Sequence, residues 1–264
     1  MKYSFKINKI NEELVVTGKS EKTLDKLLEI CDPKDLILCG GIVINHHLQK
    51  NSLTVPSAIG QDDVDMKVMD LKTLRKILEG AKKDFYISHY HDYAKKKGDY
   101  IHIDRFFGVL VDKKNNVKVD IFDIENFPPQ ELNEFKYKSK KILARTLEDQ
   151  IITKMLETYR ILGTSCKENA INPKQFAELY WLVSISNPLK IQRLWTLHPY
   201  HNTLKDTFPM NFPENFEEAY TKSLSWMYHH PEIVERFKKK DIDEKYKKSC
   251  PECTEDPDFP LKNK

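Results

Sequence analysis

Three acidic residues lie in stretches of the sequence whose pattern is typical of β-strands. Asp63 and Asp65 fall in DVDMKV, and Asp120 falls in VKVDIFDI; apolar and polar residues alternate in both. Side chains two residues apart on a strand share a face, so the first two carboxylates are expected roughly 7 Å apart along it. Like charges at that distance repel, and their burial is costly without compensation. The pattern therefore predicts a metal site formed by all three acids, with the oxygen ligands that Mg²⁺ prefers.

Two adjacent glycines precede the acidic pair in the chain. Gly40 and Gly41 end the apolar run DLILCG and open IVINHHLQK, which follows as a helix candidate. Without side chains they let backbone N–H groups approach a ligand closely, and the start of a helix carries the positive end of its dipole. We therefore expect an anion site at these glycines. Phosphates there and a metal at the aspartates would describe a bound nucleoside triphosphate.

The stretches around these residues alternate between strands and helices. DLILCG is typical of a buried strand, DVDMKVM of a half-buried one, and Asp70 is placed to cap the helix that follows. DFYISHY predicts another strand, and two longer strands are joined by a turn at residues 113–116. At the N-terminus, the alternating stretches 3–8 and 12–17 predict a short hairpin.

A helical period dominates the sequence after Pro128 and Pro129. LEDQIITKMLETYRIL and NPKQFAELYWLVSIS carry apolar stripes, and further helices are expected at 188–197, 214–229 and 231–248. The predicted fold class is therefore α+β. A mixed β-sheet domain is expected over residues 1–128, followed over residues 129–264 by an all-helical domain that ends in a polar tail.

Composition and charge limit the class of protein. Hydrophobic residues make up 40% of the 264 residues and charged residues 31%, so a packed core is expected rather than disorder. A net charge of +3 does not indicate nucleic-acid binding by itself. No stretch approaches the ~18 apolar residues of a membrane helix, and the five cysteines form no disulfide pattern. A soluble cytoplasmic protein is the expectation. Cys250 and Cys253 could supply half of a zinc site, but no second pair completes it.

The order of these motifs resembles the nucleotidyltransferase superfamily, whose fold is called polymerase-β-like. Its signature is an apolar residue with Gly-Gly or Gly-Ser, then Asp-x-Asp on one strand and a further acid on another; here it reads LCGG, DVD and VDI. Within the superfamily the chain is most similar to the AbiEii group, the toxin component of bacterial toxin–antitoxin pairs. LEDQIITKML and NPKQFAELYWL carry that likeness, which covers roughly residues 30–185.

The resemblance implies a chemistry and a role for each motif. Two Mg²⁺ ions would bind at Asp63, Asp65 and Asp120, and Gly40 and Gly41 would hold the phosphates of a nucleoside triphosphate such as ATP. The lysine of LEDQIITKML, Lys154, would face the triphosphate. A nucleoside monophosphate would pass to an acceptor hydroxyl and pyrophosphate would leave. The acceptor stays open between an RNA end such as that of tRNA, a protein and a small molecule. An antitoxin partner is a further expectation.

Two other functions are compatible with the sequence. One is a catalytically inactive nucleotide-binding or interaction module that keeps the fold. AIGQD precedes the acidic pair where relatives usually carry a basic and a small hydroxyl residue, which favours that alternative. The other is a nucleic-acid binder, suggested by the lysines and aromatics of FKYKSKK and ERFKKKDIDEKYKK, although these also read as solvated helix faces.

Overall fold

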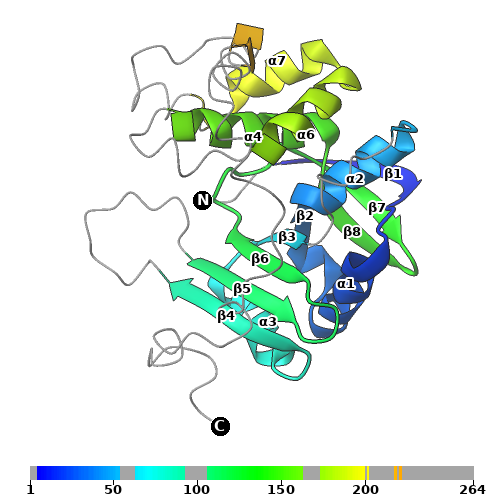
Figure 1. Cartoon of the computed structure of the whole chain (residues 1–264), viewed down its shortest axis with the longest axis vertical. Coiled ribbons are helices and arrows are strands. Elements are labelled where there is room, and N and C mark those ends of the chain that lie inside the picture. The colour runs from blue at the N-terminus through cyan, green and yellow to red at the C-terminus, as the bar shows by residue number, and fades with distance from the viewer. Residues whose placement is uncertain are drawn as a thin grey trace.

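A mixed eight-stranded sheet forms the centre of the molecule, and helices pack on one of its faces and at one end (Figure 1). The computed structural model describes residues 5–53, 63–92, 106–162, 173–199, 201, 217–218 and 220–221. The strands are β1 (Lys6–Glu13), β2 (Leu36–Cys39), β3 (Asp63–Val68), β4 (Phe85–Asp92), β5 (Phe106–Asp112), β6 (Lys118–Asp123), β7 (Glu131–Tyr137) and β8 (Lys140–Arg145). The helices are α1 (Gly18–Ile30), η1 (Pro33–Asp35, a 3₁₀ turn), α2 (Gly40–Lys50), α3 (Leu71–Ala81), α4 (Leu147–Leu162), α6 (Pro173–Ser184) and α7 (Pro188–Leu197).

The strand order is β1-β7-β8-β2-β3-β6-β5-β4. The pairs β1–β7, β8–β2 and β3–β6 are parallel, and the other four pairs are antiparallel. Strands β2, β3 and β6 lie in the middle of the order, so the segments that carry the glycines and the three acids are neighbours in the sheet. The strands predicted at β2, β3, β4, β5 and β6 are all present.

Two expectations for the strands are wrong. Strands β7 and β8 lie beyond residue 128, where only helices were expected, and they pair with β1 and β2 in the same sheet. The segment 129–264 is therefore not all-helical. The N-terminal hairpin is also absent among the described residues, because β1 is a single strand that pairs in parallel with β7. Strands β7 and β8 also form a local antiparallel hairpin with each other, with Tyr137 opposite Lys140, so this pair was open to prediction from the sequence. The parallel pairing of β1 with β7 joins strands remote in sequence, and local alternation could not reveal it.

The first hydrophobic core lies between the sheet and helices α1 and α3. Alternate residues of the central strands point into it: Val64, Met66 and Val68 of β3 are fully buried there, as are Val119 and Ile121 of β6. Leucine and isoleucine side chains from both helices close this core; they include Leu24, Leu27, Leu28, Leu74, Ile77 and Leu78. The opposite face of the same strands is left to the polar residues.

The second core joins the helices at the end of the sheet. Apolar side chains of α4, α6 and α7 pack with Ile44 and Leu48 of α2; they include Ile151, Ile152, Met155, Leu156, Leu179, Leu182, Leu194 and Trp195. Helix α2 also contributes Ile42 and Val43 to the first core. The helix that begins at the two glycines therefore holds the sheet and the helical end together. The helices expected at 214–229 and 231–248 lie almost entirely outside the described residues, as do Cys250 and Cys253.

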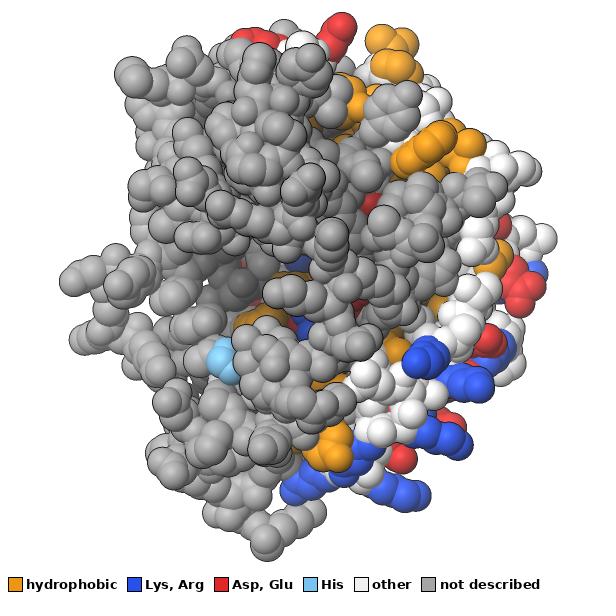
Figure 2. Space-filling model, in the orientation of Figure 1, with side chains coloured by type: hydrophobic (Ala, Val, Ile, Leu, Met, Phe, Trp, Pro, Cys, Tyr) orange, Lys and Arg blue, Asp and Glu red, His pale blue; other side chains and the backbone are white. Residues whose placement is uncertain are grey.

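The visible surface carries charges of both signs. Figure 2 shows Lys and Arg side chains gathered at the lower right of this face, with Asp and Glu among them. Such mixed charge is typical of a solvated surface and gives no continuous basic stripe there. Within the described part of the chain, no helix has the length and apolar character needed to cross a membrane.

Candidate active site

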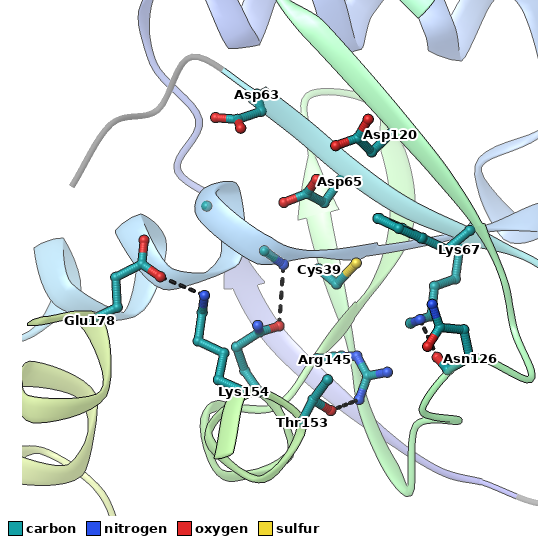
Figure 3. Close-up of a pocket in the computed structure, with 14 residues that line it drawn as sticks. Cys39, Asp63, Asp65, Lys67, Asp120, Asn126, Arg145, Thr153, Lys154 and Glu178 are labelled. Atoms are coloured by element: carbon teal, nitrogen blue, oxygen red, sulfur yellow. Dashed lines mark hydrogen bonds and ion pairs between the residues drawn. The ribbon is translucent and has the colours of Figure 1, made fainter. Parts of the chain in front are cut away.

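A polar cavity of about 250 Å³ opens where β3, β6, α2 and α4 meet (Figure 3). All six residues singled out in the sequence belong to its surroundings, and the cavity is lined by Cys39, Gly40, Gly41, Asp63, Asp65, Lys67, Asp120, Phe122, Asn126, Arg145, Gln150, Thr153, Lys154 and Glu178. The structure thus brings the two glycines, the three acids and Lys154 together from four separate elements.

The acids reach the cavity because β3 and β6 lie side by side in parallel. Asp65 is the register partner of Asp120, and Asp63 is the partner of Lys118. The alternation of both strands buries their apolar residues on the opposite face. Figure 3 shows the three carboxylates projecting to the same side of the sheet. The alternation of apolar and polar residues in the sequence predicted, for each strand separately, that its acids lie on the face opposite its apolar residues.

Burial and mutual repulsion disfavour the charged form of two of these acids. Burial raises the pKa of the Asp65 carboxyl, and the nearby charges of Asp120 and Asp63 raise it further. The pKa of Asp120 is also raised by burial, although its ion pair with Lys118 acts in the other direction. Negative charge is therefore concentrated here at a free-energy cost, which is the situation that a bound cation relieves.

Lys118 is a site residue that the sequence analysis did not single out. Its Nζ lies 2.6 Å from Oδ2 of Asp120. Burial alone would lower the pKa of Lys118, but Asp120, Asp65 and Asp63 outweigh burial and raise it. The other carboxylate oxygen, Oδ1 of Asp120, is buried and has no hydrogen-bond partner. The alternation that puts Lys118 on the face of Asp120 was the available signal.

The glycine turn fits against Asp65. Gly40 has φ +63°, and a β-carbon built on it would lie 1.8 Å from Oδ2 of Asp65. Its N–H donates to Oε1 of Gln150 on α4 at 3.3 Å, so α4 holds the turn in place. Gly41 follows in the first turn of α2, whose N-terminus is directed at the cavity. Gln150 was missed because its role depends on how α4 docks.

Lys154 lines the cavity, and an acid that the sequence did not indicate lies beside it. Its Nζ is 2.5 Å from Oε2 of Glu178 on α6, and both side chains are nearly buried. In this arrangement Glu178 balances the charge of Lys154. Any contact of Lys154 with a phosphate would compete with that ion pair.

A buried arginine stabilises the wall formed by α4. Arg145 donates from Nη1 to Oδ2 of Asp149 and to Oγ1 of Thr153, each at 2.5 Å, and from Nη2 to the carbonyl of Phe127. Asp149 also accepts from the backbone N–H of Gln130 at 2.7 Å. This network ties β8, α4 and the start of β7 together, so Asp149 has a structural role and is not a candidate for chemistry.

Aromatic rings continue from the cavity across the neighbouring strands. Phe122 lines the cavity, and its ring centroid lies 5.1 Å from that of Phe107 on β5. The Phe107 ring is in turn 6.2 Å from that of His89 on β4, and Lys67 Nζ lies 5.4 Å from the Phe122 centroid. All three rings are half-buried. They lead from the acids toward the edge strand β4.

The acidic residues fit a hard divalent cation. Asp63, Asp65 and Asp120 offer only oxygen donors, and the buried, unpartnered Oδ1 of Asp120 is an acceptor that a cation could satisfy. Among the described residues, no group of three or more His, Cys, Asp or Glu side chains is already gathered tightly enough to hold an ion. The site is therefore open as it stands, with the donor chemistry but not the closed geometry of a metal centre.

Comparison with known proteins gives distant structural likenesses only. No family model and no curated protein sequence matches the chain. A candidate nucleotidyltransferase from H. pylori is 13% identical over 84% of this chain and 97% of its own, with a TM-score of 0.32. An antigenic nucleotidyltransferase-like protein from Paracoccidioides brasiliensis is 14% identical over 87% and 90%, with a TM-score of 0.37. JHP933 from Helicobacter pylori is 14% identical over 84% and 94%, with a TM-score of 0.30. Likeness at this level does not assign an activity.

Proposed function

We propose that the protein is a metal-dependent nucleotidyltransferase that moves a nucleoside monophosphate from a nucleoside triphosphate to an acceptor hydroxyl. The observation that carries the proposal is the register pairing of Asp65 with Asp120 directly beside the Gly40 turn, within one polar cavity. Carboxylates for a cation and backbone N–H groups for phosphates are thereby adjacent. These are the two requirements for binding a metal–triphosphate complex.

Each residue of the site has a defined part in this reaction. Asp63, Asp65 and Asp120 would hold Mg²⁺, which when bound supplies charge neutralisation at the reacting phosphate and its neighbours. Gly40 and Gly41 present the start of α2 to the phosphates. Asp120, whose pKa is raised by burial, is suited to accept the proton of the acceptor hydroxyl. The acceptor oxygen then bonds to the α-phosphorus as the bond to the pyrophosphate oxygen breaks.

Lys154 is suited to the departing pyrophosphate. It lies in the cavity wall opposite the acids, and a phosphate would replace Glu178 as its partner. In its more specific form, the proposal is that the enzyme has an AbiEii-type role, as a toxin with an antitoxin partner. The acceptor would be an RNA end, a protein or a small molecule. It would approach the acids from the side of the rings of Phe122, Phe107 and His89.

A second candidate function is a nucleotide-binding module without turnover. Two ion pairs favour it, because Lys118 already neutralises Asp120 and Glu178 already neutralises Lys154. In that case nucleotide would bind at the glycine turn with little dependence on metal. The residues that distinguish the two candidates are thus the acids rather than the glycines.

The test measures metal-dependent transfer and metal-dependent binding separately. The purified protein is incubated with each α-labelled nucleoside triphosphate, Mg²⁺ and cell extract, and incorporation of label into RNA, protein and small molecules is followed. Asp65→Asn should abolish transfer, whereas Asp35→Asn, a carboxylate outside the cavity in η1, should leave it unchanged. Calorimetric binding that requires Mg²⁺ but gives no labelled product would support the second candidate. Full transfer by Asp65→Asn would refute the first.

A further inference from the structure

We call Asp63, Asp65 and Asp120 the acidic cluster. The ammonium group of Lys118 is already in contact with this cluster. Lys118 lies two residues before Asp120 on β6, so the two side chains share a face, and their charged atoms are 2.6 Å apart. Lys118 is also the register partner of Asp63 on β3. It therefore lies among all three acids, while Lys154 and Arg145 are engaged with Glu178 and Asp149.

We propose that Lys118 is a built-in counter-ion of the acidic cluster, which neutralises Asp120 in the metal-free protein and is displaced when a divalent cation binds. Its charge substitutes for part of the charge of the cation. The cluster can thus fold without metal although like charges lie side by side, with Asp63 and Asp65 half-buried and Asp120 buried. The identity of the displacing cation rests on the proposed function; the counter-ion role in the metal-free protein does not.

The geometry allows the exchange without moving a strand. The Lys118 side chain is 30% exposed, whereas that of Asp120 is 11% exposed. A lysine side chain is long and flexible, so its ammonium can leave Asp120 for solvent while the carboxylate stays in place. The pair occupies Oδ2 of Asp120 and leaves the buried Oδ1 without a partner. Lys118 therefore pairs with one oxygen of Asp120 only, and a divalent cation could contact the other oxygen as well.

If Lys118 is a counter-ion, its loss should change cation affinity in the opposite direction from the loss of a lysine with a purely structural role. Loss of Lys118 should destabilise the metal-free protein but strengthen its binding of a divalent cation, because the competitor is gone and the cluster is more negative. A lysine with a purely structural role would weaken both. Lys26 provides the matched comparison, since its Nζ lies 2.7 Å from Asp112 with 22% of the lysine side chain exposed, and neither residue lines the cavity.

The experiment compares Lys118→Met and Lys26→Met with the unaltered 264-residue chain at pH 8. Melting temperature is measured in EDTA and in Mg²⁺, and Mn²⁺ affinity is measured by electron paramagnetic resonance. We expect both variants to melt about 2–4 °C lower in EDTA. In Mg²⁺ the deficit in melting temperature relative to the unaltered chain should disappear for Lys118→Met and persist for Lys26→Met. Lys118→Met should bind Mn²⁺ about three- to tenfold more tightly than the unaltered chain, and Lys26→Met should bind it equally.

The outcomes separate this inference from the proposed function. Unchanged or weaker Mn²⁺ binding by Lys118→Met, with normal binding by the unaltered chain, overturns the inference and leaves the proposed function intact. Equal recovery of both variants in Mg²⁺ overturns it as well. If no form of the chain binds Mn²⁺, the displacement fails together with the metal-dependent reaction. A Lys118→Arg variant that restores the behaviour of the unaltered chain would support the role of charge rather than of packing.

Discussion

Gly40 and Asp65 are so close that no side chain could stand at the glycine. A β-carbon there would lie 1.8 Å from Oδ2 of Asp65 and 2.7 Å from its β-carbon, and the backbone already has φ +63°. The glycine turn and the acidic strand are therefore one unit, in which the start of α2 is held against a carboxylate. The same relationship puts the backbone at the start of α2 next to a carboxylate oxygen.

Gly40→Ala should destabilise the protein more than backbone strain alone predicts. Gly18 gives the control, because it has φ +68° and nothing within 4 Å of the added carbon. Gly18→Ala should cost about 1–2 kcal/mol of unfolding free energy from the left-handed backbone. Gly40→Ala should cost at least about 3 kcal/mol, since the clash with Asp65 adds to that strain. Urea unfolding of both variants checks this; equal costs would mean that the turn and Asp65 can move apart.

Removal of an acid from the cluster should stabilise the metal-free protein while abolishing transfer. The pKa of Asp65 is raised by burial and by the two neighbouring acids, so its charged form is unfavourable in the folded state. At pH 8 in EDTA, the free energy of unfolding of Asp65→Asn should therefore be about 1–2 kcal/mol higher than that of the unaltered chain. Mg²⁺ should stabilise the unaltered chain and not the variant. A less stable Asp65→Asn in EDTA would show that the carboxylate is already satisfied.

The local period of the sequence was sufficient to place the three acids on one face of their strands, but not to predict what surrounds them. Alternation alone placed Asp63, Asp65 and Asp120 on cavity-facing sides, because a strand repeats every two residues wherever it pairs. Gln150 and Glu178 could not be predicted, since helix–sheet and helix–helix docking brings them to Gly40 and Lys154.

The same distinction explains one of the two errors in the strand assignment. Strand β7 carries charged residues between its apolar ones and pairs in parallel with β1, more than a hundred residues earlier in the chain. The loss of the expected hairpin at 3–17 does not follow from local pattern, because it depends on this remote pairing. Strands β7 and β8 form a local antiparallel hairpin, so their absence from the prediction is a missed local signal. The place of β1 at the edge of the sheet depends on a strand remote in sequence, so it is evident only in the folded chain.

Asp112 should make the fold sensitive to acid. Burial alone would raise the pKa of this carboxyl, but bonds from Lys26 at 2.7 Å, Thr23 at 2.8 Å and the backbone of Asn115 outweigh burial and lower it to about 2. Because the folded pKa lies below the unfolded one, the carboxylate contributes stability above about pH 4, and this is lost as pH falls toward 2. The loss should be about 2 kcal/mol.

Guanidinium unfolding between pH 6 and pH 2 measures this contribution. Asp112→Asn should be less stable than the unaltered chain at pH 6, and its stability should fall less steeply as acid is added. Asp35→Asn, at a half-buried position of the turn η1, should follow the unaltered chain. Parallel curves for Asp112→Asn and the unaltered chain would assign the acid sensitivity to other carboxylates.

The aromatic rings beside the cavity should affect the acceptor and not the nucleotide. Phe107 lies between the cavity-lining Phe122 and His89 on the outer strand β4, whereas the glycine turn is on the other side of the acids. Phe107→Ala should therefore raise KM for the acceptor about fivefold or more and leave the calorimetric Kd of the triphosphate unchanged. Tyr86→Ala is the control, because its half-exposed ring lies beside Lys113 rather than in this row. A weakened nucleotide Kd in Phe107→Ala would place the base of the triphosphate on the rings and move the acceptor elsewhere.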